Sequence, residues 1–426
     1  MSLNLDNLTP DERTFFETLQ AAGMPLTDAA LREEFAAMAD DAGLTITNNS
    51  NYSPFWCFVT SAVVNPVRWL TAFAVRRIMP GLYVKTAGGA LLDILAWSYG
   101  ITRKPSATMQ GYLTFTRQEA DAGTGVLVIP AGTAVRSVPV AGIAYRVETV
   151  EEAVIPAGTR SIRVLAEATA PGAAYNLGAT YYSIVDGDMA GRVTATNDAE
   201  YLVSPGADQE SDVELRLRLR NYFTAVSDWH TDAKYKAMIS SLTGFRVDRL
   251  FFVHDAPRGP GTADVYVLFD ADAEPADYLG KVNQYIMQDG NHGHGDDVVV
   301  KALPGKYYAV RLRVVLRDTL TVDARLELLA KIETLVECAF RKNRAYADEI
   351  TQTWPNSFFS FSKLDYELHG QFSGILSLSW EYRPATEAET ESGQFDESAG
   401  GWIKGDIPSE LDVPRLLKLV MTEVSQ

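Results

Sequence analysis

The stretch from 86 to 117 constrains the fold most, because the spacing of its apolar residues changes along it. Residues 91–97 place apolar side chains at helical spacing, and Gly100 and Pro105 predict the end of this helix. From Gly111 onward apolar residues recur at every second position, which is typical of a half-buried strand. We therefore expect helices before this stretch and strands after it.

Three helices are expected before residue 86, beginning after Thr9, Thr27 and Ser53. The third contains the most apolar segment, 55–78, which Pro66 and three arginines interrupt, so its uncharged part is too short to cross a bilayer. Because apolar residues lie around most of this helix, it must be covered on most sides. A self-contained bundle and a bundle completed by a partner helix both fit. The candidate partner anchors are Phe55, Trp56, Phe58, Trp69 and Phe73.

Strand-like sequence dominates from 111 to 205. The pentapeptide Ile-Pro-Ala-Gly-Thr occurs at 129–133 and again at 155–159, and proline followed by glycine predicts a tight turn in each copy. We expect a β-sandwich or barrel with two similar corners. A sugar-binding β-module would have the same pattern, so this block alone does not identify a function.

The remainder alternates helix and strand twice, which predicts two small α+β sandwich domains. Residues 384–403 contain five acidic side chains and no lysine or arginine, which favours a flexible acidic linker. The tail at 409–424 regains apolar spacing. The predicted fold is therefore α+β and multidomain. Its predicted parts are a helical bundle region, an all-β domain, two α+β domains, and a linker with tail, at 1–110, 111–205, 206–305, 306–385 and 386–426.

Composition narrows the function classes. The 426 residues carry a net charge of −17, which argues against non-specific binding to nucleic acid or to anionic membranes. The two cysteines, Cys57 and Cys338, lie in unrelated contexts, so neither a disulfide framework nor a thiolate metal site is expected. The first residues lack the pattern of a signal peptide. A reducing cytoplasm is the simplest compartment for synthesis.

Motifs for catalysis are not found: the chain has no phosphate-binding glycine loop, nucleophile elbow, HExxH or CxxC. The segment 289–297 could hold a metal, because His292 and His294 alternate among aspartates, but a polar loop between a helix and a strand is the favoured interpretation. Arg216, Arg218 and Arg220 could form a phosphate-binding comb, but the pattern favours a solvated or ion-paired helix surface. We expect no catalytic residue, no cofactor and no metal.

The joint resembles the baseplate J-like family. In that family a small-Gly-x-x-Leu-Asp-x-Leu-Ala helix precedes a Gly-hydrophobic-x-Arg-x-Pro turn and a Gly-x-hydrophobic-Thr-Phe strand. Further similar signals follow in order, so that the resemblance spans about 55–380. The matching residues of the joint are Gly89, Leu92, Asp93, Leu95, Ala96, Gly100, Ile101, Arg103, Pro105, Gly111, Thr114 and Phe115.

The resemblance implies a structural role in the baseplate wedge of a contractile phage tail or a related injection machine. Such subunits form dimers within wedges, join wedges into a ring around the hub, and contribute N-terminal helices to a bundle with a second wedge protein. The implied partners include hub and sheath-initiating baseplate proteins, and the implied location is the virion baseplate after assembly in the host cytoplasm. The ring rearranges when the sheath contracts. A hub-associated cell-wall glycan hydrolase and a carbohydrate-binding tail module are the alternatives.

Overall fold

The computed structural model describes residues 7–44, 50, 53–118, 125–225, 230–269, 275–393, 395–396 and 400–424. The chain forms two compact units. Unit 1 is Met1–Arg103 with Ser211–Phe223, and unit 2 is Lys104–Glu210 with Thr224–Gln426. The fold mixes helices and several sheets, as the sequence predicted.

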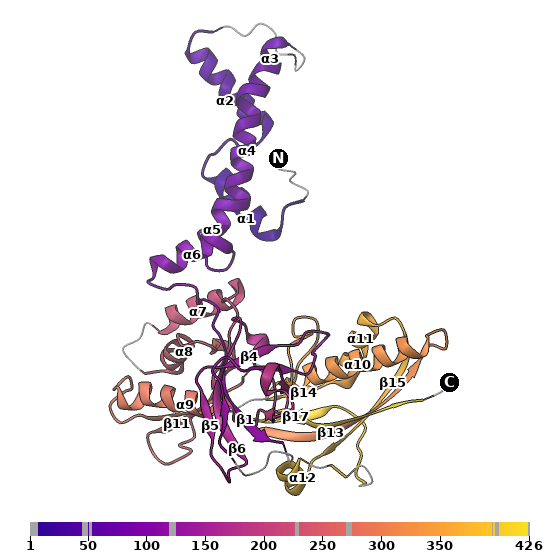
Figure 1. Ribbon diagram of the computed structural model, residues 1–426. Coiled ribbons are helices and arrows are strands. Elements are labelled where there is room, and N and C mark those ends of the chain that lie inside the picture. The colour runs from indigo at the N-terminus through magenta and orange to yellow at the C-terminus, as the bar shows by residue number, and fades with distance from the viewer. Residues whose placement is uncertain are drawn as a thin grey trace. The chain divides into compact units, whose positions relative to one another are not determined.

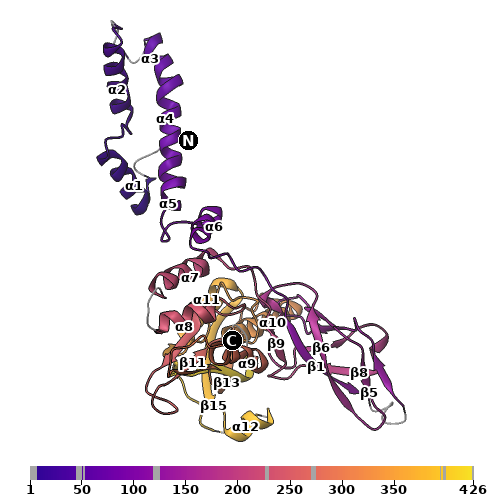
Figure 2. The same ribbon diagram turned by 90° about the vertical axis from the view of Figure 1, so that its left-hand side faces the viewer.

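Unit 1 is helical, and its predicted starts are confirmed. The Thr9 hydroxyl accepts a hydrogen bond from the backbone N–H of Glu12 (3.3 Å), and the Glu12 carboxylate accepts one from the N–H of Thr9 (2.8 Å). Thr27 caps the second helix in the same way. Figures 1 and 2 show α2 beside the stretch from α3 to α4. The helices are α1 (Pro10–Ala21), α2 (Asp28–Asp41), α3 (Pro54–Val59), α4 (Asn65–Phe73), α5 (Met79–Gly81), α6 (Gly89–Ser98) and α7 (Asp212–Ala225).

The elements α3, α4 and α5 form one long helix from 54 to 81, joined by π-helical turns at Thr60–Val64 and Ala74–Ile78. A proline, Pro66 or Pro80, lies just after each π-helical turn. Proline has no N–H for the helical ladder and its ring crowds the carbonyl four residues earlier. A wider turn before it relieves that crowding, so the long helix continues through both prolines.

The β region of unit 2 begins with β1 (Gln110–Arg117), whose side chains alternate between buried and half-buried, as predicted. The main sheet is antiparallel in the order β7-β3-β4-β6-β1-β8, and β9 also pairs with β1. The end strands β7 and β8 lie against each other, so the sheet nearly closes into a barrel. These strands are β3 (Ala134–Ser137), β4 (Arg146–Thr149), β6 (Ser161–Ala168), β7 (Tyr182–Val185), β8 (Val193–Thr196) and β9 (Leu202–Ser204).

The two Ile-Pro-Ala-Gly-Thr copies follow a pair of short strands, β2 (Leu127–Ile129) and β5 (Ala153–Ile155). These strands pair with each other antiparallel, and a turn follows each of them. Gly132 and Gly158 have φ of 77° and 81°, a conformation that suits glycine. The repeated pentapeptide therefore forms two equivalent turns.

Two three-stranded sheets make up the rest of unit 2. In the first, β11 pairs antiparallel with β10 and parallel with β12; in the second, β13 pairs antiparallel with β15 and parallel with β17. The elements around the first sheet are α8 (Asp232–Ser240), β10 (Leu250–Val253), β11 (Thr262–Val267), α9 (Ala276–Asn283) and β12 (Asp297–Ala302). Those around the second are β13 (Gly305–Leu316), α10 (Val322–Ala339), β14 (Ser357–Phe359), α11 (Phe361–Gln371), β15 (Ile375–Pro384), α12 (Glu387–Ser392), β16 (Ile407–Ser409) and β17 (Val413–Glu423).

The structure differs from the predicted linker and tail. The described part of the acidic segment contains α12, and two of its aromatic rings lie against arginines: Phe395 against Arg383 and Trp402 against Arg311. The tail was expected to dock on the body or on a neighbour, and it pairs with β13 of the same chain as strand β17. Acidic composition predicted solvation, and the two ring–guanidinium contacts were not predicted.

Helix α7 also falls outside its predicted group. The sequence grouped its residues with 206–305, whereas the structure assigns most of the helix to unit 1. Leu215 and Leu219 are fully buried in one cluster with Leu92 and Ala96 of α6. The unit to which α7 belongs is set by its burial against α6, a distant segment of the chain. The local spacing of apolar residues in α7 does not reveal this contact.

Candidate partner interface

The joint after α6 is held by charged side chains. The Arg103 guanidinium lies 2.7 Å from a carboxylate oxygen of Asp93 and 2.7 Å from one of Asp212. Asp212 also accepts a hydrogen bond from the backbone N–H of Gly89 (2.8 Å). The hydrogen bond from Gly89, with the Arg103 pair, lowers the pKa of Asp212. These contacts tie both ends of α6 to the start of α7.

The glycines of this joint have backbone roles. Gly100 has φ of 71° just after α6, where its N–H donates to the Trp97 carbonyl and closes the helix end. Gly111 lies in β1, and a Cβ there would come within 2.6 Å of the Tyr201 ring. Leu92 is fully buried, whereas Pro105 is exposed. The residues of the sequence motif therefore build a structural joint.

Within the described residues, α1 and α2 cover one side of the long helix of unit 1. Its buried residues, such as Val59 and Val75, pack against α2 and α1. Phe58 and Trp69 are 69% and 53% exposed, and the Trp69 ring stacks on Phe73 with 5.6 Å between centroids. Of the five anchors predicted from the sequence, Phe55, Phe58, Trp69 and Phe73 are exposed, and the Trp56 side chain lies outside the described residues.

Helix α6 adds to this apolar surface. Its Ile94 and Trp97 are 61% and 72% exposed, while Leu92 and Ala96 point into the core of unit 1. The apolar run of α6 was predicted from the sequence, but which of its residues are exposed and which are buried was not. The signal was available, since residues 94 and 97 are three apart and share a helix face.

One helix of the described residues, Cys57–Gly81, is long and apolar enough to cross a membrane by length and composition, and 31% of its most apolar window is buried. The sequence had predicted that its uncharged part is too short. Arg68, Arg76 and Arg77 lie within the helix.

The candidate metal ligands are not gathered into a site. The His292 ring nitrogen lies 2.8 Å from the carbonyl of Gly293, and Asp296 accepts a hydrogen bond from the Tyr235 hydroxyl. Among the residues that the structure describes, no group of three or more His, Cys, Asp or Glu side chains is placed to hold an ion. The predicted loop between a helix and a strand fits these contacts.

Two arginines of α7 contact backbone carbonyls and do not form an open phosphate-binding comb. Arg216 donates to the carbonyl of Ala87 (2.8 Å), and Arg218 donates to the carbonyl of Thr102 (2.6 Å). Both acceptors flank α6 in the same unit. Arg216 also lies 3.9 Å from the Asp212 carboxylate, an ion pair within α7, as the second sequence interpretation expected. These arginines therefore reinforce the joint.

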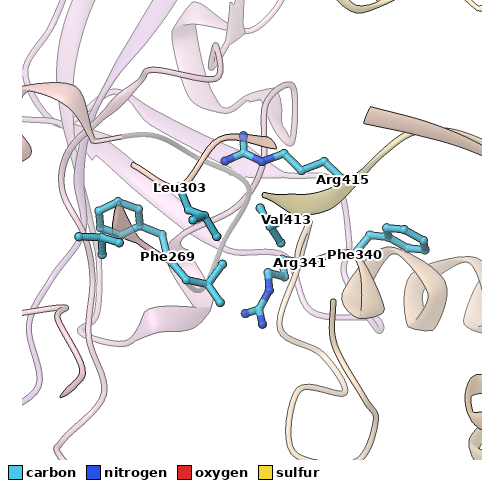
Figure 3. Close-up of a pocket in the computed structure, with 8 residues that line it drawn as sticks. Phe269, Leu303, Phe340, Arg341, Val413 and Arg415 are labelled. Atoms are coloured by element: carbon cyan, nitrogen blue, oxygen red, sulfur yellow. The ribbon is translucent and has the colours of Figure 1, made fainter. Parts of the chain in front are cut away.

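A small pocket in unit 2 contains two arginines that the sequence did not single out (Figure 3). Arg341 donates two hydrogen bonds to the Thr353 carbonyl (2.7 and 2.9 Å), and burial lowers its pKa to about 10. In Figure 3 the guanidinium groups of Arg341 and Arg415 point in different directions. They do not converge on one ligand. The lining residues are Val267, Leu268, Phe269, Leu303, Phe340, Arg341, Val413 and Arg415.

Comparisons with known proteins match a family, a relative and solved structures. The family model of the baseplate J-like protein barrel domain matches residues 112–202. A protein of Haemophilus phage HP1, described as "Putative baseplate protein gp29", is 36% identical over 377 residues, which cover 86% of this chain and 94% of that protein. A chain in the cryo-EM structure of the anti-feeding prophage baseplate is 11% identical to this chain. The match covers 90% of this chain and 90% of that chain, with a TM-score of 0.30.

Proposed function

Because this chain belongs to the baseplate J-like family, we propose that it is a structural wedge subunit in the baseplate of a contractile phage tail or a phage-derived particle. We further propose that it pairs with a second copy within a wedge and joins neighbouring wedges into the ring around the hub. Its proposed location is the virion, next to hub and sheath-initiating proteins, after assembly in the host cytoplasm. Nucleic acid and membrane are not among its proposed partners.

The observation that carries this proposal is the exposed apolar side of unit 1. Phe58, Trp69 and Phe73 line one stretch of the long helix, all of them 43% exposed or more. Burying a side chain of this kind is worth about 1.5–3 kcal/mol, so leaving several in water is costly. Large exposed apolar patches normally mark a binding surface. The proposed occupant is a helix of a second wedge protein, which completes the bundle.

The proposed role is structural, without catalytic turnover. The HP1 relative is named for the baseplate and not for a reaction. The motif residues Asp93 and Arg103 are engaged in holding the joint together. The alternatives, a cell-wall glycan hydrolase and a carbohydrate-binding module, are separated from this role by release of fragments from peptidoglycan and by retention on a glycan array.

A conformational role is proposed for the α+β region, 227–382. Ring contacts must hold during assembly and change when the sheath contracts, so their two arrangements should differ by only a few kcal/mol. The small sheets β10-β11-β12 and β15-β13-β17 are rigid elements suited to such contacts. Particles imaged before and after contraction should show these elements with altered neighbours or altered relative angles. Unchanged neighbours and angles would exclude this role.

Replacing Trp69 with aspartate tests the proposed docking surface. The chain is co-expressed with the other tail proteins of its particle, and complexes are isolated through a tag on this chain. Trp69→Asp should lose the second wedge protein, because a charge cannot be buried in an apolar interface without a partner.

Tyr366→Asp is the matched control, since Tyr366 is an 81% exposed aromatic residue on α11 of unit 2. It should keep the complex. Circular dichroism should show both variants folded like the wild type. Retention of the complex by Trp69→Asp, or its loss from both variants, would contradict the proposal.

A further inference from the structure

One face of the sheet β15-β13-β17 is unusually basic. Along β13, Tyr308, Val310 and Leu312 point into the core, so Arg311 and Arg313 point to the opposite face. In the parallel pairing with β17, Lys418 is the partner of Ala309, which places Lys418 on the same face as these arginines. We call this the outer face, defined by Arg311, Arg313, Lys418 and the neighbouring Lys404.

Among the described residues, a single carboxylate lies between the exposed cations of the outer face. Glu381 lies 3.6 Å from Arg311, and it is shared by the exposed Arg313 and Lys404 at 4.0 and 3.9 Å. The Lys418 side chain is exposed and makes no hydrogen bond or ion pair with the described residues. A positive surface stands out on a chain of net charge −17.

Part of the outer face is already covered by this chain. The Trp402 ring lies 4.0 Å from the Arg311 guanidinium, and the Phe395 ring lies 4.6 Å from that of Arg383. The side chains of Arg313 and Lys404 remain 54% and 76% exposed. The segment after β15 therefore leaves open the part of the face that carries exposed positive charge.

The same segment presents a matching acidic surface. In α12, Glu389 is held by Arg383 at 2.6 Å, and this contact lowers its pKa to about 2. Glu387 and Glu391 are exposed, and they share a helix face because they are four residues apart. Neither carboxylate makes a hydrogen bond or an ion pair with the described residues. One chain thus displays a basic face and a short acidic helix.

We propose that the outer face binds the exposed acidic side of α12 from a second copy of this chain. Charge complementarity carries the proposal, since the surplus cations of one copy meet the surplus carboxylates of the next. The contact joins two different surfaces, so each copy keeps one free surface of each kind, as members of a ring do. The inference deepens the proposed ring contact and rests on it. Exposed ion pairs are screened by salt, so added salt should weaken the contact.

Zero-length crosslinking tests the contact directly. Full-length chain grown with heavy isotopes is mixed with unlabelled chain at low ionic strength, and a carbodiimide joins lysine amines to carboxylates. Mass spectrometry should find heavy–light links between Lys418 or Lys404 and Glu387 or Glu391. High salt should abolish these links, whereas the Lys404–Glu381 link within one copy should persist. If all links are within one copy, or if links between copies lie elsewhere, the inference is wrong.

A charge exchange gives the second test. Arg313→Glu with Lys418→Glu reverses the outer face, and Glu387→Lys with Glu391→Lys reverses α12. Each double variant alone should lose at least 10-fold in low-salt self-association measured by sedimentation velocity. An equal mixture should recover it, because each copy then finds a complementary surface on the other variant.

Lys363→Glu on α11, where Lys363 is exposed, is the control and should leave association unchanged. Variants that associate like the wild type, or a mixture that does not recover, would overturn the inference. The Trp69→Asp experiment tests a different surface, in unit 1. If the complex with the second wedge protein depends on Trp69 but no crosslink forms between copies, this contact alone is rejected. If neither the complex nor the crosslinks are found, the proposed function is rejected as well.

Discussion

Replacing Arg103 with methionine should destabilise unit 1 by about 2 kcal/mol. The methionine keeps an apolar stem but removes the guanidinium that contacts Asp93 and Asp212, each at 2.7 Å. A hydrogen bond to a charged group contributes about 1.5–3 kcal/mol. Both carboxylates are more than a third exposed, so solvent screening reduces each contribution to about 1 kcal/mol. Asp212 keeps its bond from Gly89, which limits the loss.

Hydrogen exchange measured by mass spectrometry is the suitable assay, because it reads α6 and α7 separately from unit 2. Arg103→Met should lower protection across 89–98 and 212–223, whereas peptides of the β region should not change. Arg103→Lys should lose about half as much, since an ammonium group reaches one carboxylate more readily than two.

The effect should depend on pH. Asp212 has a lowered pKa in the folded chain, so its stabilising contribution is present above the ordinary aspartate pKa of about 3.9 and is lost as pH falls through the lowered value. The difference between wild type and Arg103→Met should shrink accordingly in acid. Equal protection of both proteins at neutral pH would refute the role assigned to Arg103.

Three further predictions concern unit 2. Gly111→Ala should cost about 1–3 kcal/mol in denaturant unfolding, because the new methyl group meets the Tyr201 ring; an unchanged midpoint would contradict this. Burial raises the pKa of Glu337, so the folded chain favours the protonated carboxyl. The folded chain therefore loses stability as pH rises and Glu337 ionises. Glu337→Gln should therefore stabilise the chain more at pH 8 than at pH 4, and the reverse order would be evidence against a buried carboxyl. Elemental analysis should find no stoichiometric zinc or iron; metal lost on replacing His292 and His294 with alanine would overturn this.

Local signals predicted much of the fold. The capping residues at Thr9 and Thr27 and the alternation in β1 depend only on near neighbours, and the structure confirms them. Strand β17 was missed because its register shifts between Leu416 and Lys418, which breaks the alternation of two. Its inward residues then have a spacing that does not indicate a strand.

The candidate surfaces were predictable only in part. The aromatic anchors of the long helix follow from composition and helical spacing, but which side α1 and α2 cover depends on packing. The ion pair of Arg103 with Asp212 joins residues 109 positions apart, and no sequence spacing reveals it. The outer face likewise depends on the pairing of β13 with β17, two strands that are distant in sequence.

Cryo-EM of the assembled particle, at a resolution that shows side chains, would locate this chain and its neighbours. We expect the chain in the baseplate wedge, with Phe58, Trp69 and Phe73 buried against a helix of another wedge protein. Absence of the chain from the baseplate would contradict the account. So would a baseplate in which these three side chains remain exposed to solvent.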